Sequence, residues 1–184
     1  NMLQREHELL DLVWNRLKVI PGLHILADQH RDRLAIISFY IDDLHYNLAV
    51  RLLNDRYGIQ TRGGCSCAGT YGHYLLHVSR SYSKSITEQI NRGDKTEKPG
   101  WIRLSLHPTT TDAEALKLVE AIATLAENHP TWAKDYTYDP ATNEYTHAEA
   151  TGAIGRRVSE WFDEFGQSAV VADKWEAMGL GYEI

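Results

Sequence analysis

The sequence predicts an α/β fold, an α+β sandwich in which helices cover one side of a small sheet. Segments with apolar residues at helical spacing alternate with short apolar runs that are typical of strands. Hydrophobic residues make up 43% of the 184 positions, which is enough to bury a single core. Breaks that contain glycine or proline separate these segments.

The first elements along the chain are a helix and two strands. Apolar residues recur at helical spacing over Glu6–Lys18, and Pro21 with Gly22 ends this helix. Leu23–Ala27 is a candidate for a short strand. Arg33–Ile41 predicts a longer strand, and because nearly all of its side chains from Leu34 on are apolar, we expect both of its faces to be buried.

A second helix is expected over Leu44–Tyr57, where leucines recur on one side. Asp42 or Asp43 can cap its first turn, and Gly58 suits the left-handed position that follows its last turn. Ile59–Arg62 then predicts a short strand that runs into a glycine-rich loop.

A helix, a strand and a longer helix follow this loop. Tyr82–Asn91 predicts the first helix, with Ser81 or Ser83 as its cap. Thr111 and Glu114 form a capping box that begins the longer helix, which we expect to end at about Asn128. Trp101–His107 alternates, with one face made of Ile102, Leu104 and Leu106 and the other of Arg103, Ser105 and His107.

The composition changes at Pro130, which predicts two regions. Residues 1–130 form the domain described above, and residues 131–184 form an aromatic, turn-rich and partly helical C-terminal extension that packs on it. Arg156–Phe165 and Ala169–Met178 are candidates for two short helices of this extension.

Charge and cysteine content limit the possible functions. The net charge of −6 and the lack of a basic patch argue against a nucleic-acid partner. No stretch approaches the ~18 apolar residues of a membrane helix, so no membrane partner is expected. Two cysteines one residue apart cannot build a disulfide scaffold, which favours a reducing, cytoplasmic location.

The two cysteines lie in the segment RGGCSCAGTYGHYL, which spans Arg62–Leu75. Its four glycines allow positive φ angles and close backbone approach. From these residues alone, Cys67 can be a nucleophile, a metal ligand or a residue without a chemical role. A nucleophilic role requires a thiolate with positive charge nearby, which Arg62 can supply.

Two motifs together resemble a known family. The segment GIQTRGGCSCAG, and KPGWIRLSLHPTTTDAEALKLVEAI further on, resemble the C-terminal small domain of class V aminotransferase-fold enzymes, which depend on pyridoxal phosphate (PLP). Within this family they are most similar to the cysteine desulfurases and selenocysteine lyases. The resemblance covers roughly Leu9–Asn128 and implies the small, helix-covered sheet of the C-terminal domain in fold-type I PLP enzymes.

The resemblance implies roles for individual residues. Cys67 would be the catalytic nucleophile that attacks the sulfur or selenium of the substrate, and Cys65 is a possible secondary thiol. Arg103 would bind the α-carboxylate of the amino-acid substrate, for which a planar guanidinium is well suited. Arg62 would bind the same carboxylate or orient the loop.

The resemblance also implies a cofactor and partners. In this family the PLP-binding lysine lies on a large N-terminal domain, so we expect no cofactor-binding residue and no metal site in this chain. The missing N-terminal PLP-binding domain would be its partner, and the full-length enzyme would be a homodimer. The chain alone is therefore expected to be inactive.

Other functions remain open. If the thiols have only a structural role, the full-length enzyme would catalyse transamination. A non-catalytic interaction module could keep the fold without the chemistry, with the C-terminal extension as its docking surface. A metal-binding module would use Cys65, Cys67, His73 and His77, of which the two histidines have the spacing of zinc ligands.

Overall fold

The computed structural model describes residues 1–65, 69–149 and 160. The chain divides into two compact units, residues 1–146 and 147–184. The first unit contains a four-stranded sheet with helices packed on one side, which confirms the predicted α/β fold. The two helices predicted in the extension lie outside the described residues, except for residue 160, so they stay predictions. The predicted domain boundary at residue 130 also stays a prediction.

The sheet is antiparallel throughout, and its strand order is β1-β2-β4-β3. The two outer strands have only three residues each, and β3 begins at Arg62, three residues later than the predicted strand. The strands are β1 (Leu23–Ile25), β2 (Ile36–Ile41), β3 (Arg62–Gly64) and β4 (Trp101–Ser105).

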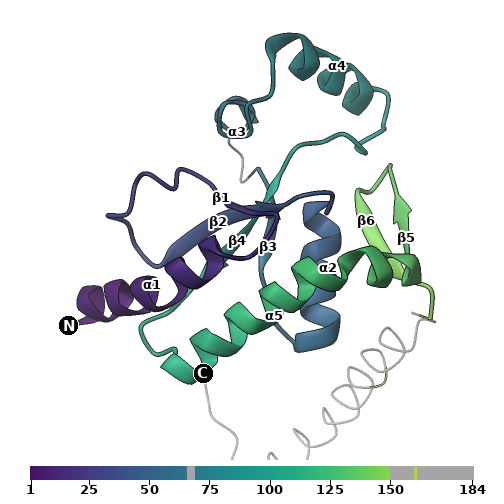
Figure 1. Ribbon diagram of the computed structural model, residues 1–184. Coiled ribbons are helices and arrows are strands. Elements are labelled where there is room, and N and C mark those ends of the chain that lie inside the picture. The colour runs from purple at the N-terminus through teal and green to yellow at the C-terminus, as the bar shows by residue number, and fades with distance from the viewer. Residues whose placement is uncertain (66–68, 150–159, 161–184) are drawn as a thin grey trace, which may run out of the picture. The chain divides into compact units, whose positions relative to one another are not determined.

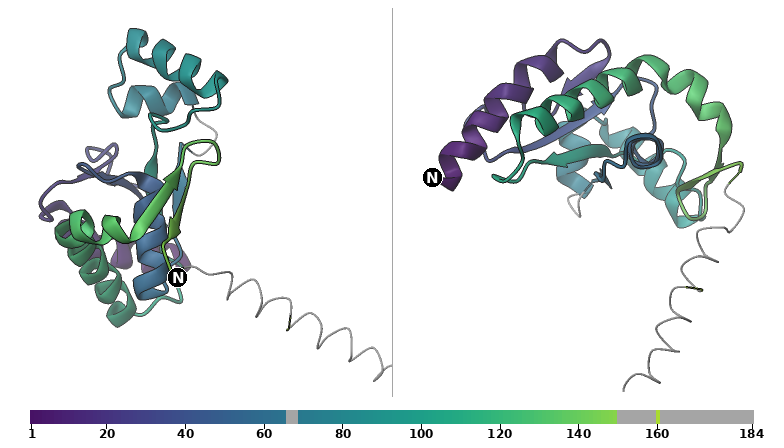
Figure 2. Two further views of the ribbon diagram at one scale, coloured as in Figure 1. Left: turned by 90° about the vertical axis from the view of Figure 1, so that its right-hand side faces the viewer. Right: turned by 90° about the horizontal axis from the view of Figure 1, so that it is seen from below.

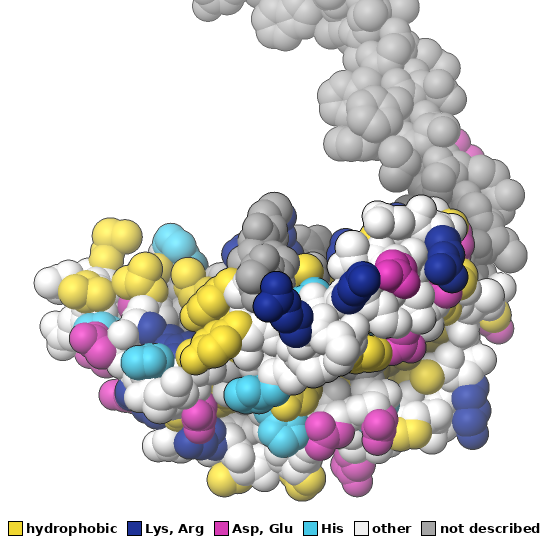
Figure 3. All heavy atoms as spheres, turned by 90° about the horizontal axis from the view of Figure 1, so that it is seen from above, with side chains coloured by type: hydrophobic (Ala, Val, Ile, Leu, Met, Phe, Trp, Pro, Cys, Tyr) yellow, Lys and Arg dark blue, Asp and Glu magenta, His cyan; other side chains and the backbone are white. Residues whose placement is uncertain are grey.

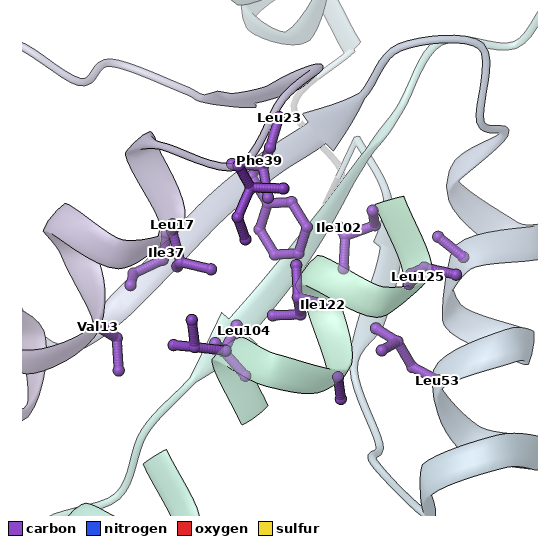
Figure 4. Packing of buried hydrophobic residues seen from close by; sticks show 14 of the residues in the cluster. Val13, Leu17, Leu23, Ile37, Phe39, Leu53, Ile102, Leu104, Ile122 and Leu125 are labelled. Carbon is purple, nitrogen blue, oxygen red and sulfur yellow. The ribbon is translucent and has the colours of Figure 1, made fainter. Parts of the chain in front are cut away.

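Three helices cover one face of the sheet: α1 (Met2–Lys18), α2 (Tyr46–Tyr57) and α5 (Asp112–Trp132). Figure 1 shows them on the lower side of the sheet, and Figure 2 shows α1 and α5 side by side. Their apolar stripes pack on the inward side chains of the strands around Phe39, Ile102 and Ile122, all fully buried (Figure 4). Burial of this apolar surface is the main stabilising contribution to the fold.

Only one face of β2 is buried, so the expectation of burial on both faces was wrong. Ile37, Phe39 and Ile41 are buried, whereas Ser38 and Tyr40 are partly exposed and Ile36 is 42% exposed. The three covering helices lie on one side of an antiparallel sheet, which leaves the other face partly open.

The predicted capping box of α5 is present, because the Thr111 side chain accepts from the backbone of Glu114 and the Glu114 side chain accepts from Thr111. The helix continues beyond the expected end at Asn128 and reaches Trp132, with Pro130 in its last turn. Because proline has no backbone N–H, Pro130 cannot donate the helix hydrogen bond that another residue at this position would give to the carbonyl of Ala126.

Two further helices lie between β3 and β4: α3 (Gly69–Leu75) and α4 (Arg80–Asn91). The prediction of α4 was right within two residues, but its cap is Ser79 and not Ser81 or Ser83, because the helix begins two residues earlier than expected. The sequence did not predict α3, because its glycines indicate a loop. Figure 1 shows both helices on the side of the sheet opposite α1 and α5.

A β-hairpin follows α5 and a short 3-10 turn (Ala133–Asp135). Its strands are β5 (Tyr136–Asp139) and β6 (Glu144–His147), in a region whose sequence predicted only turns. Asn143 has the left-handed φ of 65°, a conformation that asparagine tolerates well. The Tyr136 hydroxyl donates to Asp55 at 3.0 Å, which links the hairpin to α2.

His45, and not Asp42 or Asp43, caps α2, which corrects the predicted cap. Its Nδ1 accepts from the backbone N–H of Asn47 at 3.1 Å. Asp42 instead lies 3.0 Å from His24 Nε2, and Asp43 has a φ of 56° in the preceding turn. Histidine is an uncommon cap, so residue preference alone pointed to the aspartates.

The His45 ring is enclosed by aromatic side chains. It stacks on Tyr46 with ring centroids 4.4 Å apart and lies 5.4 Å from Tyr138 and 5.3 Å from Tyr145. Its Nε2 atom is buried without a hydrogen-bond partner in the described part of the chain. Burial therefore lowers the pKa of His45 from its ordinary value of 6.5.

This lowered pKa predicts a pH-dependent stability. The folded chain binds a proton at His45 less readily than the unfolded chain, so the contribution of His45 is present above pH 6.5 and is lost as the pH falls below this value. Protonation of Nδ1 also removes the helix cap, which is worth about 1 kcal/mol. Between about pH 7.5 and about pH 5, we expect the unfolding free energy to fall by roughly 1 kcal/mol through His45.

Urea unfolding at several pH values measures this slope. His45→Asn is the control, because asparagine keeps a capping oxygen and does not titrate. The other histidines are unchanged in this variant, so only the contribution of His45 disappears from the slope. Parallel pH dependence in the two proteins would contradict the prediction.

Candidate active site

The face of the sheet opposite α1, α2 and α5, called the open face below, carries the polar side chains of the strands. Successive side chains of a strand point to opposite faces. In β4, Ile102 and Leu104 are buried while Arg103 is half-buried and Ser105 is exposed, which confirms the predicted alternation. Strand pairing places Ser38 opposite Arg103 on one side and Arg62 opposite Arg103 on the other, which forms one row across the open face.

Arg62 and Arg103 are direct neighbours across the β3–β4 pair. Side chains in this relation have Cβ atoms about 4.5–5.5 Å apart, and like charges placed there repel. Within residues 1–65 and 69–149, neither guanidinium forms an ion pair. The Nε atom of Arg103 is buried and lacks a hydrogen-bond partner there. Two facing cations without a counter-ion are suited to binding an anion such as a carboxylate.

The cysteine loop begins directly after β3. Cys65 follows Gly64 and is a half-buried free thiol. A Cβ built on Gly72 of α3 would lie 3.2 Å from Cβ of Cys65 and 3.1 Å from the ring of Trp101, so α3 packs closely on both residues. The predicted nucleophile Cys67 lies outside the described residues, and its role stays a prediction.

Tyr46 of α2 lies beneath the strands that carry the two arginines. A Cβ on Gly63 would lie 3.0 Å from Cδ2 of Tyr46, and a Cβ on Gly100 would lie 2.5 Å from its Cε1. Gly64 has a φ of 113°, which other residues rarely adopt. Gly63 within β3 and Gly100 directly before β4 therefore allow the aromatic ring of Tyr46 to touch the backbone, a contact that the sequence did not reveal.

A hollow of about 440 Å³ adjoins the open face at β1 and β2. Tyr40, a diagonal neighbour of Arg103 in the sheet, lines it together with His24, Tyr74 and His77. His24 stacks on Tyr40 with ring centroids 4.7 Å apart, and its Nε2 lies 3.0 Å from the carboxylate of Asp42. The hollow thus places hydrogen-bonding side chains beside the row of the arginines.

A larger hollow of about 930 Å³ lies elsewhere, between α5 and the segment that follows α2. Lys117, Glu114 and Glu120 are among its lining residues, and neither arginine of the pair is. Charged residues of both signs line this larger hollow, and none of the predicted site residues does. We therefore identify the candidate site by the arginine pair and not by the size of a cavity.

The open-face side of the molecule also carries exposed aromatic residues. Tyr71 and Tyr74 of α3 are 57% and 76% exposed, and their rings stack with centroids 6.3 Å apart. Figure 3, which views the molecule from this side, shows hydrophobic side chains gathered beside Lys and Arg side chains. Exposed aromatic groups of this kind often mark a contact surface.

The predicted metal ligands are not gathered within the described residues. His73 Nδ1 lies 2.6 Å from the Ser83 hydroxyl, and His77 lines the smaller hollow. No group of three or more His, Cys, Asp or Glu side chains in the described part of the chain could hold a metal ion. None of the described helices has the length and apolar character needed to span a lipid bilayer.

Comparison with known proteins gives one family and several similar structures. The family model Aminotransferase class-V matches residues 1–118. No curated protein matches the sequence. The apo structure of cysteine desulfurase from Thermococcus onnurineus NA1 aligns with a TM-score of 0.47 and 17% identity, over 69% of this chain and 26% of that chain.

A second solved structure, cysteine desulfurase CsdA (S-sulfonic acid) from Escherichia coli, aligns with a TM-score of 0.44 and 19% identity. This alignment covers 68% of the present chain and 25% of CsdA. The chain thus spans about a quarter of the length of each of these two desulfurases.

Proposed function

The chain belongs to the class-V aminotransferase family, and from this premise we propose that it forms the C-terminal domain of a PLP-dependent enzyme that acts on an amino acid. The observation that carries the proposal is the facing pair of Arg62 and Arg103 on the open face of the sheet, two guanidinium groups for which the described residues provide no counter-ion. An amino-acid carboxylate is the anion that this family membership suggests.

Arg103 provides the main carboxylate contact. Its side chain is half-buried, and its Nε–H is a donor without an acceptor, so a carboxylate would satisfy a group that is costly to leave unpaired. Arg62 is exposed on the outer strand and supplies a second positive charge. Together they orient the substrate with its side chain free to reach the cysteine loop.

The reaction is proposed to be of the cysteine desulfurase or selenocysteine lyase type. Cys67 acts as the nucleophile toward sulfur or selenium, and Cys65 is the secondary thiol. When bound to the complete enzyme, PLP supplies the electron sink for bond cleavage. Loss of the thiol function would leave transamination as the reaction of the same site.

The described residues fit the substrate carboxylate but not the cofactor itself. The row of the sheet that holds the arginine pair contains Ser38 and no lysine. Lys84, the first lysine after the cysteine loop in the sequence, is exposed on α4. We propose that the cofactor lysine lies on an N-terminal domain outside this chain, and that the complete enzyme is a cytoplasmic homodimer.

Titration with L-cysteine tests the proposal in the isolated chain. Cysteamine, which lacks the carboxylate, is the matched ligand. We expect the Nε–H resonance of Arg103 to shift with L-cysteine at a dissociation constant in roughly the millimolar range, and to remain unchanged with cysteamine. Equal responses to both ligands would contradict a carboxylate site. The chain alone is expected to lose PLP during gel filtration, and a retained lysine-bound cofactor would refute that part.

A non-catalytic interaction module is the second candidate. The exposed and stacked Tyr71 and Tyr74 favour it, because they offer an aromatic contact surface without any catalytic group. Absence of any carboxylate-dependent response in the titration would support this candidate over the enzyme domain.

A further inference from the structure

We infer that Asn143 of the β5–β6 hairpin is a positioning residue for the active site. It holds Tyr46 against the backbone of β3 and β4 and thereby sets the place of Arg62 and Cys65. The inference rests on the proposed function in assigning these two residues to an active site. The two hydrogen bonds between the hairpin and α2 on which it depends join residues 97 and 96 positions apart in the sequence.

Asn143 is a buried polar residue whose side-chain amide, backbone carbonyl and backbone N–H all form hydrogen bonds. It is 7% exposed, and its side-chain Nδ2 donates to the Tyr46 hydroxyl at 2.8 Å. Its Oδ1 accepts from the Tyr138 hydroxyl at 2.9 Å. Its backbone carbonyl accepts from Asn47 Nδ2, and its backbone N–H donates to Asp139 at 2.8 Å. The side-chain amide is thereby fixed between the hairpin and α2.

Tyr46 transmits this constraint to the sheet. Its ring is 5% exposed and packs against glycine positions of both strands. A Cβ on Gly63 would lie 2.9 Å from Asn47 Oδ1 and 3.0 Å from the Tyr46 ring, and a Cβ on Gly100 would come closer still. Because nothing larger than hydrogen separates the ring from these backbones, a shift of Tyr46 moves the strands with it.

The neighbourhood of Tyr46 reaches the cysteine loop. Burial raises the pKa of the Tyr46 phenol, and the hydrogen bond from Asn143 lowers it. A Cβ on Gly64, the residue directly before Cys65, would lie 3.9 Å from Cε2 of the Tyr46 ring. Cys65 and Tyr46 therefore lie close enough to influence each other. A change in the position of Tyr46 is expected to alter the exposure of the thiol that follows Gly64.

Alkylation of Cys65 by iodoacetamide tests the inference in the full 184-residue chain. Cys67→Ser leaves Cys65 as the only thiol, because the chain has two cysteines. Asn143→Gly tolerates the left-handed backbone and removes both hydrogen bonds of the side chain. We expect this variant to be alkylated at least about threefold faster than its parent, a change typical of one lost coupling between contacting residues.

Tyr138→Phe is the matched control. It removes the other hydrogen bond of the Asn143 amide but leaves the bond to Tyr46 in place. We expect the urea concentration at the midpoint of unfolding to fall, because the protein loses one hydrogen bond. The rate of Cys65 alkylation is expected to stay unchanged. An equal acceleration in Tyr138→Phe would reduce Asn143 to a general stabilising residue and overturn the inference.

Tyr46→Phe provides a second route if Asn143→Gly does not fold. It removes the hydroxyl that Asn143 holds and keeps the ring, so it is expected to accelerate alkylation as well. Unchanged alkylation in both variants would refute the inference. The assay uses neither substrate nor cofactor, so its outcome is independent of the L-cysteine titration that tests the proposed function.

Discussion

Arg103→Lys is expected to weaken the binding of L-cysteine to the chain by at least about tenfold. Lysine keeps the positive charge but loses the planar fork that binds both oxygens of a carboxylate. One hydrogen bond to a charged group is worth about 1.5–3 kcal/mol, which corresponds to a factor of ten or more in the dissociation constant. The buried Nε of Arg103 is the donor that lysine cannot replace.

Two further variants define what this result means. Arg62→Lys is expected to have a smaller effect, because Arg62 is exposed and contributes mainly charge. Arg92→Lys on the exposed end of α4 serves as the control and is expected to leave the affinity unchanged. The titration used for the parent chain measures all three. An affinity that Arg103→Lys does not reduce would remove Arg103 from the proposed carboxylate site.

Gly100→Ala is expected to lower the free energy of unfolding by about 2–3 kcal/mol, in the range observed for overpacked cores. The added Cβ would lie 2.5, 2.6 and 2.8 Å from three ring carbons of Tyr46. The ring cannot easily move away, because it is buried and its hydroxyl is held by Asn143. The distortion therefore falls on the start of β4, two residues before Arg103 in the open face.

Urea denaturation measures this loss. Gly58→Asn is the matched control, since a Cβ at Gly58 meets nothing within 4 Å and asparagine accepts its φ of 65°. A much smaller loss is expected there. In the double variant Gly100→Ala with Tyr46→Ala, the clash is absent, so the two substitutions are expected to cost less than the sum of their separate effects. Strict additivity would contradict the proposed contact.

Local patterns in the sequence were sufficient for the elements that depend on local chemistry. The alternation over Trp101–His107 predicted which face of β4 carries Arg103, and the capping box at Thr111 predicted where α5 begins. Both signals depend on residues a few positions apart, so tertiary contacts did not alter them.

Other features depend on contacts between distant segments. The register that places Arg62 opposite Arg103 is set by strand pairing across the α3–α4 insertion, and no periodicity of either segment specifies it. The same holds for His45, whose capping role depends on aromatic partners from the hairpin. The sequence therefore identified both arginines through a family resemblance, while only the structure shows that they are neighbours.

The outer strands of the sheet carry a consequence for solubility. β1 and β3 are each three residues long, and both leave one side of their backbone without a strand partner in the described sheet. Such edges can recruit strands of other molecules and start aggregation, and short length with a charged side chain counteracts this. Arg62 is the charged side chain on β3. Replacing it with an apolar residue would therefore make this edge strand prone to aggregation and would also alter the proposed anion site.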